Sequence, residues 1–597
     1  MKSGGRPVDN RIGGKSQGGL AAVITELIEA VHLEQRRIEE PRNRTRYFVF
    51  GKVDEREEED GVVFVFRHAP DRVLRDARYA GPRQEECLFR VGGVFLPGFM
   101  TLAETGVAIG FGFEEIAHHN LTPESVAETA GRGLEYVMDT RVLNRYLGDF
   151  LEARRDVGNP LLSEILVNRQ AVPIQPVATP PAYPDLNPSQ HHAIEKVLSQ
   201  RVTFVWGPPG TGKTKTLAAV AASLVASGKR VLLSAISNMA LDQLLLATVD
   251  RLGHTADRIS IARTGSRMDP AAEPFSRRSF DGSGKSTAQK RRAWNGHVED
   301  AQLVAANFTM LTYPRGAYPG FFDYVIADEV SMANVPSLVA ATYYATTGVA
   351  FGGDPFQLPP IYPDDAETPN DWYRANVFEM AEIHDRHDPR VAFLDTQYRM
   401  QKEIGDLVSD LFYGGELKTG TASRPVLSAF GGRVVFVQSR GRVQYSEALA
   451  GEIEDERRFN ESHAADVVGV VSSLLDAGVK GSEIGIITPY NAQVVTIAGK
   501  LRTVLGERHK ALKQIKVSTV HSFQGQERRA IVVDFTDDNV RPTRLTAKWE
   551  LINVALSRAK EQLVIVGNRS YLTNEEFFSP SEIDVFERMI AHASVVA

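Results

Sequence analysis

The sequence RVTFVWGPPGTGKTKT, at residues 201–216, decides the fold of this chain. The apolar run 202–206 predicts a buried parallel strand, and the residues from Lys215 onward predict a helix. Between them, Gly207 to Thr214 fit the pattern G-x-x-x-x-G-K-[ST] at every position. Such a loop turns backbone N–H groups around a phosphate, and the following helix adds the positive end of its dipole. The stretch therefore predicts a nucleoside-triphosphate site.

Particular side chains of this phosphate loop (residues 207–214) carry the chemistry. Lys213 is expected to reach the β- and γ-phosphates, and the Thr214 hydroxyl is expected to bind Mg²⁺. A plain Gly/Pro-rich turn is the alternative, but it does not explain the strand, the octet and the helix together. A second GKS, at residues 284–286, has Ser279 where the first glycine belongs, so we interpret it as a basic loop. The residues expected to contact the nucleotide here are Gly207, Pro209, Gly210, Thr211, Gly212, Lys213, Thr214 and Lys215.

Composition limits the class of protein. The 597 residues allow several domains, and 43% hydrophobic with 24% charged residues is typical of a globular protein. No apolar run is long enough to span a membrane and no signal-peptide core is found, so we expect a cytoplasmic protein without a membrane partner. A single cysteine, Cys87, excludes a disulfide framework and a Cys-rich zinc module. Because the net charge is −7, affinity for nucleic acid has to come from local patches.

The chain before the phosphate loop predicts a stalk and a small β domain. Residues 1–19 are rich in Gly, Lys, Arg and Ser and are expected to be disordered. Apolar residues keep helical spacing from Leu20 to about Glu40. Residues 47–53 and 62–67 predict two strands joined across Asp60-Gly61, with the acidic run 54–60 as the solvated tip of the hairpin.

The β pattern continues through residues 88–95 and 107–113. Thr122-Pro123 is typical of a helix start, and helical patterning from there to Gly158 includes residues 134–138. We therefore predict that residues 20–170 form stalk helices and a small barrel-like β domain. A proline-rich linker, 171–185, follows it.

From residue 186 the pattern of strand, loop and helix repeats, which is typical of a doubly wound α/β fold. The expected strands are too many for one small sheet. We predict two parallel-sheet domains, 186–362 and 363–597, with a break near 360–370 and ligands at the carboxyl ends of the strands. The expected strands are 202–206, 231–235, 324–327, 349–352, 391–394, 485–488, 515–519, 531–535 and 563–566.

Two acids follow the apolar segment 324–327 directly. Asp328 at the end of a strand can hold Mg²⁺ opposite Thr214, and Glu329 can orient or deprotonate the attacking water. An ordinary surface pair of acids is the alternative. The position directly behind a buried strand favours the functional interpretation.

Three further residues are candidates for the γ-phosphate. Gln357, in GDPFQLPP at 353–360, can sense this phosphate, or it can belong to a polar turn fixed by prolines. Arg399 and Arg558 can cross the cleft between the sheets and supply positive charge to the transferring phosphoryl group. By composition alone, either arginine can equally form an ordinary salt bridge.

Taken together, the motifs resemble those of superfamily 1B helicases, in the branch of the nonsense-mediated-decay and senataxin-like proteins. They stand in family order across residues 186–560, nearly two-thirds of the chain. Val330 departs from the small residue usual at its position, and residues 307–316 match so poorly that no role is carried over there. The motifs are LNPSQ (186–190), GPPGTGKT (207–214), SNMALDQ (237–243), DEVS (328–331), GDPFQLPP (353–360), QYRM (397–400), VSTVHSFQGQE (517–527) and NVALSRAK (553–560).

The resemblance implies two RecA-like domains that form a monomeric ATP-dependent motor. Such a motor moves 5′→3′ along single-stranded DNA or RNA and separates duplexes, using ATP and Mg²⁺. Two alternative functions are kept. One is an ATP-dependent clamp or ribonucleoprotein remodeller without processive unwinding. The other is a P-loop enzyme that acts on a small molecule, such as a nucleotide kinase. The motifs do not distinguish DNA from RNA.

The resemblance also implies roles for single residues. Gln190 is expected to read the adenine edge and Tyr398 to stack on the base, with Glu527 near the ribose and Gly525 beside it. Gln357 and the two arginines are expected to face the γ-phosphate. The residues in nucleic-acid-facing motifs are Ser237, Asn238, Thr519 and His521.

A basic insert, assigned to residues 251–300 of the first domain, is a further candidate surface. Residues 251–292 hold ten Lys/Arg and four Asp/Glu, and Trp294 follows. Single-stranded nucleic acid needs positive charge along its backbone and flat side chains for its bases. A solvated surface loop is an equal alternative.

Overall fold

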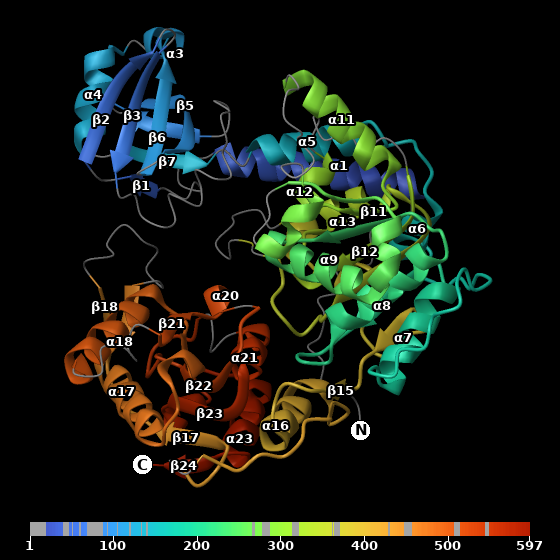
Figure 1. Cartoon of the computed structure of the whole chain (residues 1–597). Coiled ribbons are helices and arrows are strands. Elements are labelled where there is room, and N and C mark those ends of the chain that lie inside the picture. Colours follow the sequence, from blue (N-terminus) through green and yellow to red (C-terminus); the bar gives the residue numbers. More distant parts are fainter. Residues whose placement is uncertain are drawn as a thin grey trace.

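The computed structural model (Figure 1) describes most of the chain. The second GKS and all but the last residue of the expected tail, 1–19, lie outside the described residues. The described residues are 19–39, 47–49, 52–58, 61–67, 87–91, 94–103, 106–118, 121–132, 134–138, 141–265, 269–276, 287–312, 321–360, 362, 370–427, 430–446, 457–506, 514–523, 525–543 and 548–596.

A small antiparallel β domain follows the first helix of the chain and stands apart from the rest of the molecule (blue in Figure 1). Its strands pair in the order β1-β7-β4-β5-β6-β3-β2, and β5 pairs with both β4 and β6. Phe64, Phe89 and Phe111 form its aromatic core. The strands are β1 (Tyr47–Val49), β2 (Lys52–Glu58), β3 (Gly61–Arg67), β4 (Cys87–Val91), β5 (Val94–Ala103), β6 (Gly106–Gly112) and β7 (Leu134–Met138), with helices α3 (Phe113–His118) and α4 (Pro123–Arg132).

Three expectations about this region are wrong. Residues 134–138 form strand β7 instead of a helix, because they pair with β1 and β4 while Leu134 fills the β core. The spacing of the apolar residues fits both structures, and the partner strands decide between them. Residues 54–58 are not a hairpin tip, since β2 pairs with β3 along its whole length. Residues 88–95 are divided between β4 and β5.

The stalk helices belong to the body of the first parallel-sheet domain. They are α1 (Leu20–Glu39), α5 (Arg141–Glu152) and α6 (Pro160–Leu166), and the expected helix from Leu20 is confirmed. Phe150 on α5 stacks on Tyr344 with ring centroids 5.7 Å apart. Asn370 Nδ2 donates to the carbonyl of Ala30 on α1 over 2.7 Å. The stalk and the first domain therefore share one buried core.

The first parallel sheet has the strand order β10-β11-β9-β12-β13-β8-β14. Helices cover both faces, because successive residues of β8 enter different cores: Phe204 and Trp206 on one side, Val205 on the other. The strands are β8 (Val202–Trp206), β9 (Val231–Ala235), β10 (Ile261–Arg263), β11 (Leu303–Ala305), β12 (Phe322–Asp328), β13 (Ala345–Gly353) and β14 (Val391–Phe393), with helices α7 (Pro188–Ser199), α8 (Lys213–Ala226), α9 (Asn238–Leu252), α11 (Thr287–Asp300) and α13 (Val335–Thr342).

The second parallel sheet has the order β21-β20-β22-β23-β17-β24 and lies in the orange and red part of Figure 1. Two parallel sheets in an α/β chain confirm the predicted fold class. The strands are β17 (Val434–Gln438), β20 (Ile484–Thr488), β21 (Lys516–Thr519), β22 (Arg528–Asp534), β23 (Ala559–Gly567) and β24 (Ser594–Val596), with helices α16 (Lys402–Tyr413), α17 (Glu461–Asp476), α18 (Asn491–Val504), α20 (Val520–Phe523), α21 (Trp549–Leu556) and α23 (Pro580–Ala591).

The expected boundary between the domains, after residue 362, is too early. Strand β14 pairs with β8 and completes the first sheet. Phe378 belongs to the same core and packs on Phe204, with ring centroids 5.4 Å apart. The first domain therefore extends through β14, and the chain crosses to the second domain just before Tyr398. The expected strands in both sheets are present, whereas the short strands β10, β11, β17 and β24 were not predicted.

Candidate nucleotide site and nucleic-acid interface

The phosphate loop joins β8 to α8 and depends on its glycines. Gly210 and Gly212 have φ of 76° and 75°, in the left-handed region that glycine adopts without strain. A Cβ on Gly210 would lie 2.6 Å from the Cβ of Arg399, so the second domain approaches this glycine closely. The Tyr398 N–H also donates to the Gly210 carbonyl over 2.8 Å. The loop is thus part of the contact between the domains.

Three charged groups meet beside the loop. Lys213 Nζ lies 3.2 Å from Glu329 Oε1 and 3.7 Å from Asp328 Oδ1, and Thr214 Oγ1 donates to Asp328 Oδ2 over 2.7 Å. Burial raises the pKa of Asp328, and the charge of Glu329 adds to this effect. Burial lowers the pKa of Lys213, but the neighbouring carboxylates outweigh it and the pKa is raised. Lys213 therefore stays charged, as a phosphate ligand requires.

Thr214 and Asp328 fit a magnesium ion. A hydroxyl and a carboxylate are hard oxygen ligands, and Mg²⁺ in phosphate-transfer sites takes one or two protein ligands and completes its shell with phosphate and water. Within the described residues, no group of three or more His, Cys, Asp or Glu side chains is arranged to hold a metal. A metal here is therefore best held jointly with the nucleotide.

Glu329 has an unusual backbone. Its φ is 54°, in the left-handed region, and it caps the short helix η4 (Val330–Met332). Such a conformation costs about 1–3 kcal/mol in a residue other than glycine, and it occurs often at functional sites. Val330 is fully buried. The turn places the Glu329 carboxylate beside Lys213 while Val330 packs into the core.

The second domain contributes cations to this contact between the domains. Arg558 is almost fully buried, and its Nη2 lies 3.5 Å from Gln357 Oε1. Burial, and then the charge of Arg399, lower the pKa of Arg558. Arg399 Nε donates to Glu527 Oε2 over 2.5 Å, and Arg399 Nη1 donates to the Ser557 carbonyl over 3.2 Å. Both predicted arginines thus lie at the boundary between the domains.

Glu527, expected near the ribose, forms an ion pair with Arg399. It also accepts from Lys560 Nζ at 2.6 Å. Burial raises the pKa of Glu527, but Arg399 and Lys560 together lower it by more. Sequence reasoning missed Lys560, although it stands two residues after Arg558 in the same motif. Gly525, with φ of 72°, is exposed in the turn that precedes Glu527.

The Gln190 amide is occupied on both sides in this structure. Its Oε1 accepts from the Asn187 N–H and its Nε2 donates to the Thr211 carbonyl, both over 2.9 Å. Tyr398 is 48% exposed, and its hydroxyl accepts from Asn187 Nδ2 over 2.9 Å. Asn187, which sequence reasoning did not single out, therefore links the two residues predicted to hold the base. The Lys215 side chain turns away and pairs with Asp185 at 2.7 Å.

A second polar cluster lies at the same edge of the first sheet, farther from the phosphate loop. The strand order places β9, β11 and β10 beyond β12, on the side away from β8. Asn238 follows β9, and its Oδ1 accepts from Arg263 Nη2 at 3.1 Å and from Asn307 Nδ2 at 3.0 Å. Arg263 is itself paired with Asp242 at 2.7 Å, and both are buried. These two contacts fix the oxygen of the Asn238 amide, and the side chain is half-buried.

The residues around Asn238 have separate roles. The Ser237 hydroxyl caps α9 by accepting from the Ala240 N–H over 3.1 Å. Ile236 and Met239 are exposed, at 38% and 49%. A partly exposed amide between exposed apolar side chains suits a phosphate oxygen with adjacent sugars or bases. Asn307 was missed because the segment around it matches the family poorly.

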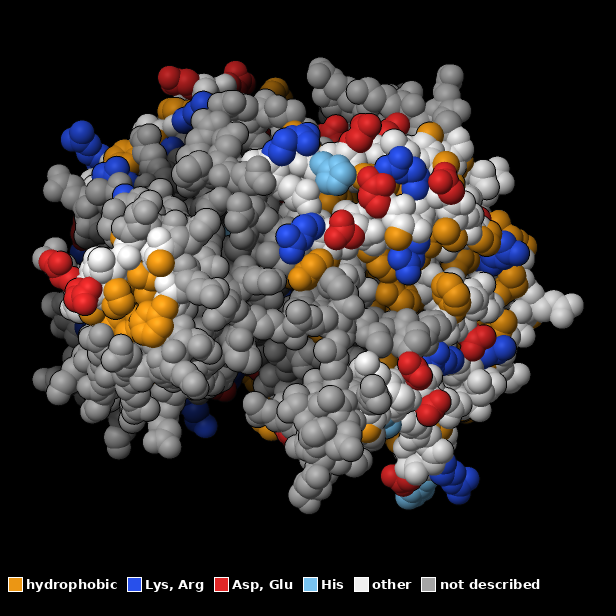
Figure 2. All heavy atoms as spheres, turned by 90° about the horizontal axis from the view of Figure 1, so that it is seen from above, with side chains coloured by type: hydrophobic (Ala, Val, Ile, Leu, Met, Phe, Trp, Pro, Cys, Tyr) orange, Lys and Arg blue, Asp and Glu red, His pale blue; other side chains and the backbone are white. Residues whose placement is uncertain are grey.

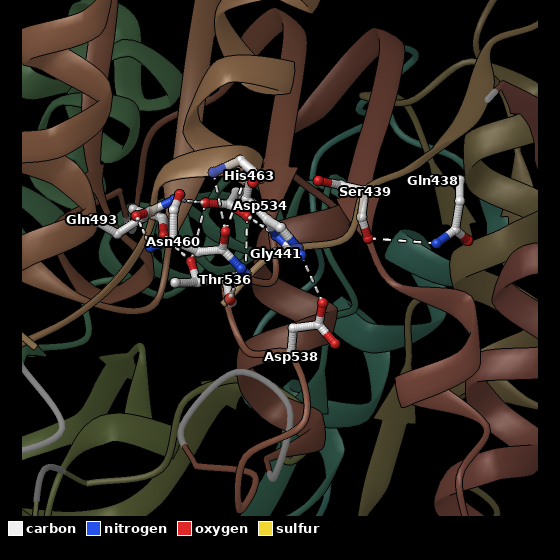
Figure 3. A network of polar contacts seen from close by, with 11 residues as sticks. Gln438, Ser439, Gly441, Asn460, His463, Gln493, Asp534, Thr536 and Asp538 are labelled. Carbon is white, nitrogen blue, oxygen red and sulfur yellow. Dashed lines mark hydrogen bonds and ion pairs between the residues drawn. The ribbon is translucent and has the colours of Figure 1, made fainter. Parts of the chain in front are cut away.

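The corresponding edge of the second sheet is fixed by a buried polar network (Figure 3). Asp534 lies at the end of β22, and its Oδ2 accepts from Gln493 Nε2 at 2.6 Å. Its Oδ1 accepts from the Thr536 N–H at 2.9 Å and lies 3.0 Å from His463 Nδ1. These side chains are fully buried. Thr536 has φ of 63°, and its hydroxyl lies 2.8 Å from that of Thr488 at the end of β20.

Thr519 and His521 lie near this network. Thr519 ends β21, which pairs with β20, and its Oγ1 donates to Ser522 Oγ at 3.3 Å. His521 is exposed on α20. Both nucleic-acid candidates of the second domain therefore stand at the carboxyl edge of its sheet, as Ser237 and Asn238 do in the first domain.

The expectation that Trp294 offers a stacking surface is wrong. Its side chain is only 8% exposed and packs in the core together with Val298 of the same helix, α11. Of the described cations in the insert, Arg251 pairs with Asp185 and Arg263 with Asp242. On the face shown in Figure 2, described basic and acidic side chains are interspersed. The described part of the insert therefore does not support a surface that binds single-stranded nucleic acid.

Comparisons with known proteins find one family match in each half of the chain. Two family models, each described as an AAA domain, match residues 185–293 and 373–570. The chain is 28% identical to the DNA replication ATP-dependent helicase/nuclease dna2 of Schizosaccharomyces pombe, over 66% of this chain and 28% of that one. It is 27% identical to a regulator of nonsense transcripts 1 homolog of Neurospora crassa (67% and 38%) and 29% identical to DNA-binding protein SMUBP-2 of Rattus norvegicus (67% and 44%).

The chain matches family models and curated relatives that together indicate a superfamily 1 helicase of the nonsense-transcript-regulator and senataxin-like branch. It spans less than half the length of each of these curated relatives. Among solved structures, the arterivirus nonstructural protein 10 helicase gives a TM-score of 0.35 at 12% identity, over 88% of this chain and 77% of that one. A TM-score this low has no bearing on the family assignment. No helix in the described part of this chain has the length and apolar character needed to cross a membrane.

Asn238→Asp is expected to weaken binding of single-stranded nucleic acid about tenfold or more, since a hydrogen bond to a charged group contributes about 1.5–3 kcal/mol. The carboxylate keeps the contact with Arg263 but replaces a partly exposed amide with an anion facing phosphate. Fluorescence anisotropy with a labelled oligonucleotide measures the change.

The matched control is Asn334→Asp, which adds the same charge to the first domain at the cap of α13. Equal losses in the two variants would show a general charge effect and remove Asn238 from the interface.

Proposed function

We propose that this chain is a motor that hydrolyses ATP to move along single-stranded nucleic acid and separate paired strands. The observation that carries the proposal is the convergence of both domains on the phosphate loop. Arg399 and Tyr398 contact Gly210, and Arg558 faces Gln357 across the boundary. A site shared between two domains couples the state of the nucleotide to their relative position.

Each residue has a role that its position supports. The loop N–H groups and Lys213 hold the phosphates, while Glu329 orients the attacking water and accepts its proton. Thr214 and Asp328 would hold Mg²⁺, which would supply positive charge to the phosphate oxygens. Arg399 and Arg558 stabilise the charge of the transition state, so catalysis consists of positioning and electrostatics without a covalent intermediate.

The ion pair between Arg399 and Glu527 supports a switching role. Arg399 is held by a carboxylate of its own domain at 2.5 Å, and it lies directly above the phosphate loop. A γ-phosphate competes with Glu527 for this guanidinium. ATP therefore favours closure of the cleft and ADP favours opening, which yields one conformational cycle per ATP.

The nucleic acid follows the carboxyl edges of the two sheets in this proposal. Asn238 marks the path on the first domain, and Thr519 and His521 mark it on the second. We infer movement 5′→3′ from the family resemblance alone. Gln190 and Tyr398 hold the base, and the amide of Gln190 exchanges its contact with Thr211 for the adenine edge.

ATP hydrolysis is expected to rise severalfold when single-stranded DNA or RNA is added, because the polymer stabilises the closed arrangement of the two domains. Steady-state ATPase assays without polymer, with single-stranded DNA and with single-stranded RNA test this and decide which polymer is preferred. Duplexes with a tail on one end only then test direction, with unwinding expected from a 5′ tail. Equal rates with and without polymer contradict the motor. Stimulated hydrolysis with no unwinding from either tail favours the clamp or remodeller.

A further inference from the structure

A buried network of hydrogen bonds crosses the boundary between the domains beside the nucleotide site. Its centre is Asp354, which follows β13 and is fully buried. Asp354 Oδ1 accepts from Trp206 Nε1 and the Phe356 N–H, both at 3.1 Å. Asp354 Oδ2 accepts from Gln357 Nε2 at 2.9 Å and from the Tyr413 hydroxyl at 2.6 Å. Three of these donors come from the first domain, and Tyr413 comes from the second.

Tyr413 extends this network of hydrogen bonds into the second domain. It ends α16, and its side chain is fully buried. Its hydroxyl accepts from Asn553 Nδ2 at 2.8 Å, and the same nitrogen donates to the Phe356 carbonyl at 2.7 Å. Asn553 lies on α21, and Arg558 follows directly after this helix. One hydroxyl thus joins the carboxylate that holds Gln357 to the helix that positions Arg558.

The surroundings make this link strong and costly to lose. Phe356 packs on Trp206 and on Tyr413, with ring centroids 5.3 Å and 5.9 Å apart. Asp354, Tyr413 and Asn553 are fully buried, and Asn553 Oδ1 has no hydrogen-bond partner among the described residues. The loss of one more hydrogen bond from buried polar groups is energetically costly. Burial, and then the charge of Asp354, raise the pKa of Tyr413, so its hydroxyl keeps the proton that it donates.

We propose that Tyr413 is a positioning residue that couples the two halves of the ATP site. It holds Gln357 and Arg558 in fixed positions relative to each other across the domain boundary. Through Asp354 it is also linked to Trp206, at the end of the strand that leads into the phosphate loop. Tyr413 touches neither nucleotide nor nucleic acid in this role. The inference rests on the proposed function. It adds Tyr413 as the residue through which contact of Gln357 with the γ-phosphate in the first domain determines the position of Arg558 in the second.

The position of Tyr413 predicts a specific kinetic signature. The phosphate loop and the base-holding residues do not depend on its hydroxyl, so the KM for ATP changes less than about twofold in Tyr413→Phe. The kcat is expected to fall about tenfold or more, because the free energy of one hydrogen bond to a charged group corresponds to a rate factor of this size. The same kcat change is expected with and without polymer, because the defect lies between the domains.

The experiment compares kcat and KM of the full chain and Tyr413→Phe at saturating polymer. Tyr344→Phe is the matched control, since it removes another buried hydroxyl, which donates to the Leu311 carbonyl at 2.7 Å within the first domain. A double-mutant cycle with Arg558→Ala separates positioning from general loss of stability. If Tyr413 acts through Arg558, adding Tyr413→Phe to Arg558→Ala slows hydrolysis no further.

The outcomes separate the two proposals. A parent protein without polymer-stimulated hydrolysis refutes the proposed function. A stimulated parent with an unchanged kcat in Tyr413→Phe, an equal loss in Tyr344→Phe, or full additivity with Arg558→Ala overturns the role of Tyr413. If circular dichroism shows that Tyr413→Phe is unfolded, Asn553→Ala removes the same link from the other side and is judged by the same criteria.

Discussion

Arg558→Ala is expected to lower kcat for ATP hydrolysis by about 10³-fold or more, with little change in ATP binding. Arg558 is the buried cation that faces Gln357, and its guanidinium stays charged at neutral pH. A cation placed where charge develops in the transition state contributes mainly to kcat, because the interaction is strongest there. Single-turnover hydrolysis, together with fluorescence-detected nucleotide binding, separates the two steps.

The control for this variant is Arg588→Ala. Arg588 lies on α23 of the same domain and pairs with Asp410 at 2.9 Å. Its removal takes away an ion-paired arginine without touching the cleft. A loss of less than tenfold in Arg558→Ala, or a similar loss in the control, would contradict the role assigned to Arg558.

Glu329→Gln is expected to retain binding of ATP and nucleic acid while turnover falls about 10²- to 10⁴-fold, the contribution typical of a positioned general base. Glutamine keeps the shape of the side chain but cannot accept the proton of the attacking water. Lys213 retains Asp328 as a carboxylate neighbour at 3.7 Å, so the phosphate site keeps its cation. The expected product is a stable complex with ATP and nucleic acid, measured by filter binding and by the rate of phosphate release.

The chain supplies a close control for this change. Glu382 has φ of 53°, almost the same left-handed backbone as Glu329, and it pairs with Arg169 outside the cleft. Glu382→Gln therefore tests the loss of a carboxylate from such a turn without the chemistry. Loss of ATP binding in Glu329→Gln, or slow turnover in both variants, would show that Glu329 is structural.

Local patterns accounted for much of the fold and for the composition of the nucleotide site. The phosphate loop was predictable because its glycines, its lysine and the flanking strand and helix are consecutive in sequence. Asp328 was predictable because it stands directly behind a strand that is apolar along its length. The roles of these residues in binding and hydrolysis remain predictions until the variants are measured.

Other features depend on residues that are far apart in the sequence. Residues 134–138 were predicted as a helix because their spacing suits either structure, and only the pairing with β1 and β4 makes them a strand. Strand β14 follows a segment that looked like an interdomain break, and only its pairing with β8 shows that it belongs to the first sheet. Trp294 looked available to bases until helix packing buried it.

The sequence by itself determined that the chain has a phosphate loop, acids behind a buried strand and two α/β units, because each of these is written in a short local pattern. Only the tertiary structure decided which of the polar residues act together. Asn307 orients Asn238 across 69 residues, and Tyr413 joins Asp354 to Asn553 across 59 and 140 residues. The physical reason is that a hydrogen bond in a buried site depends on the distance and direction between two groups in space. The spacing of residues along the sequence does not give this distance or direction.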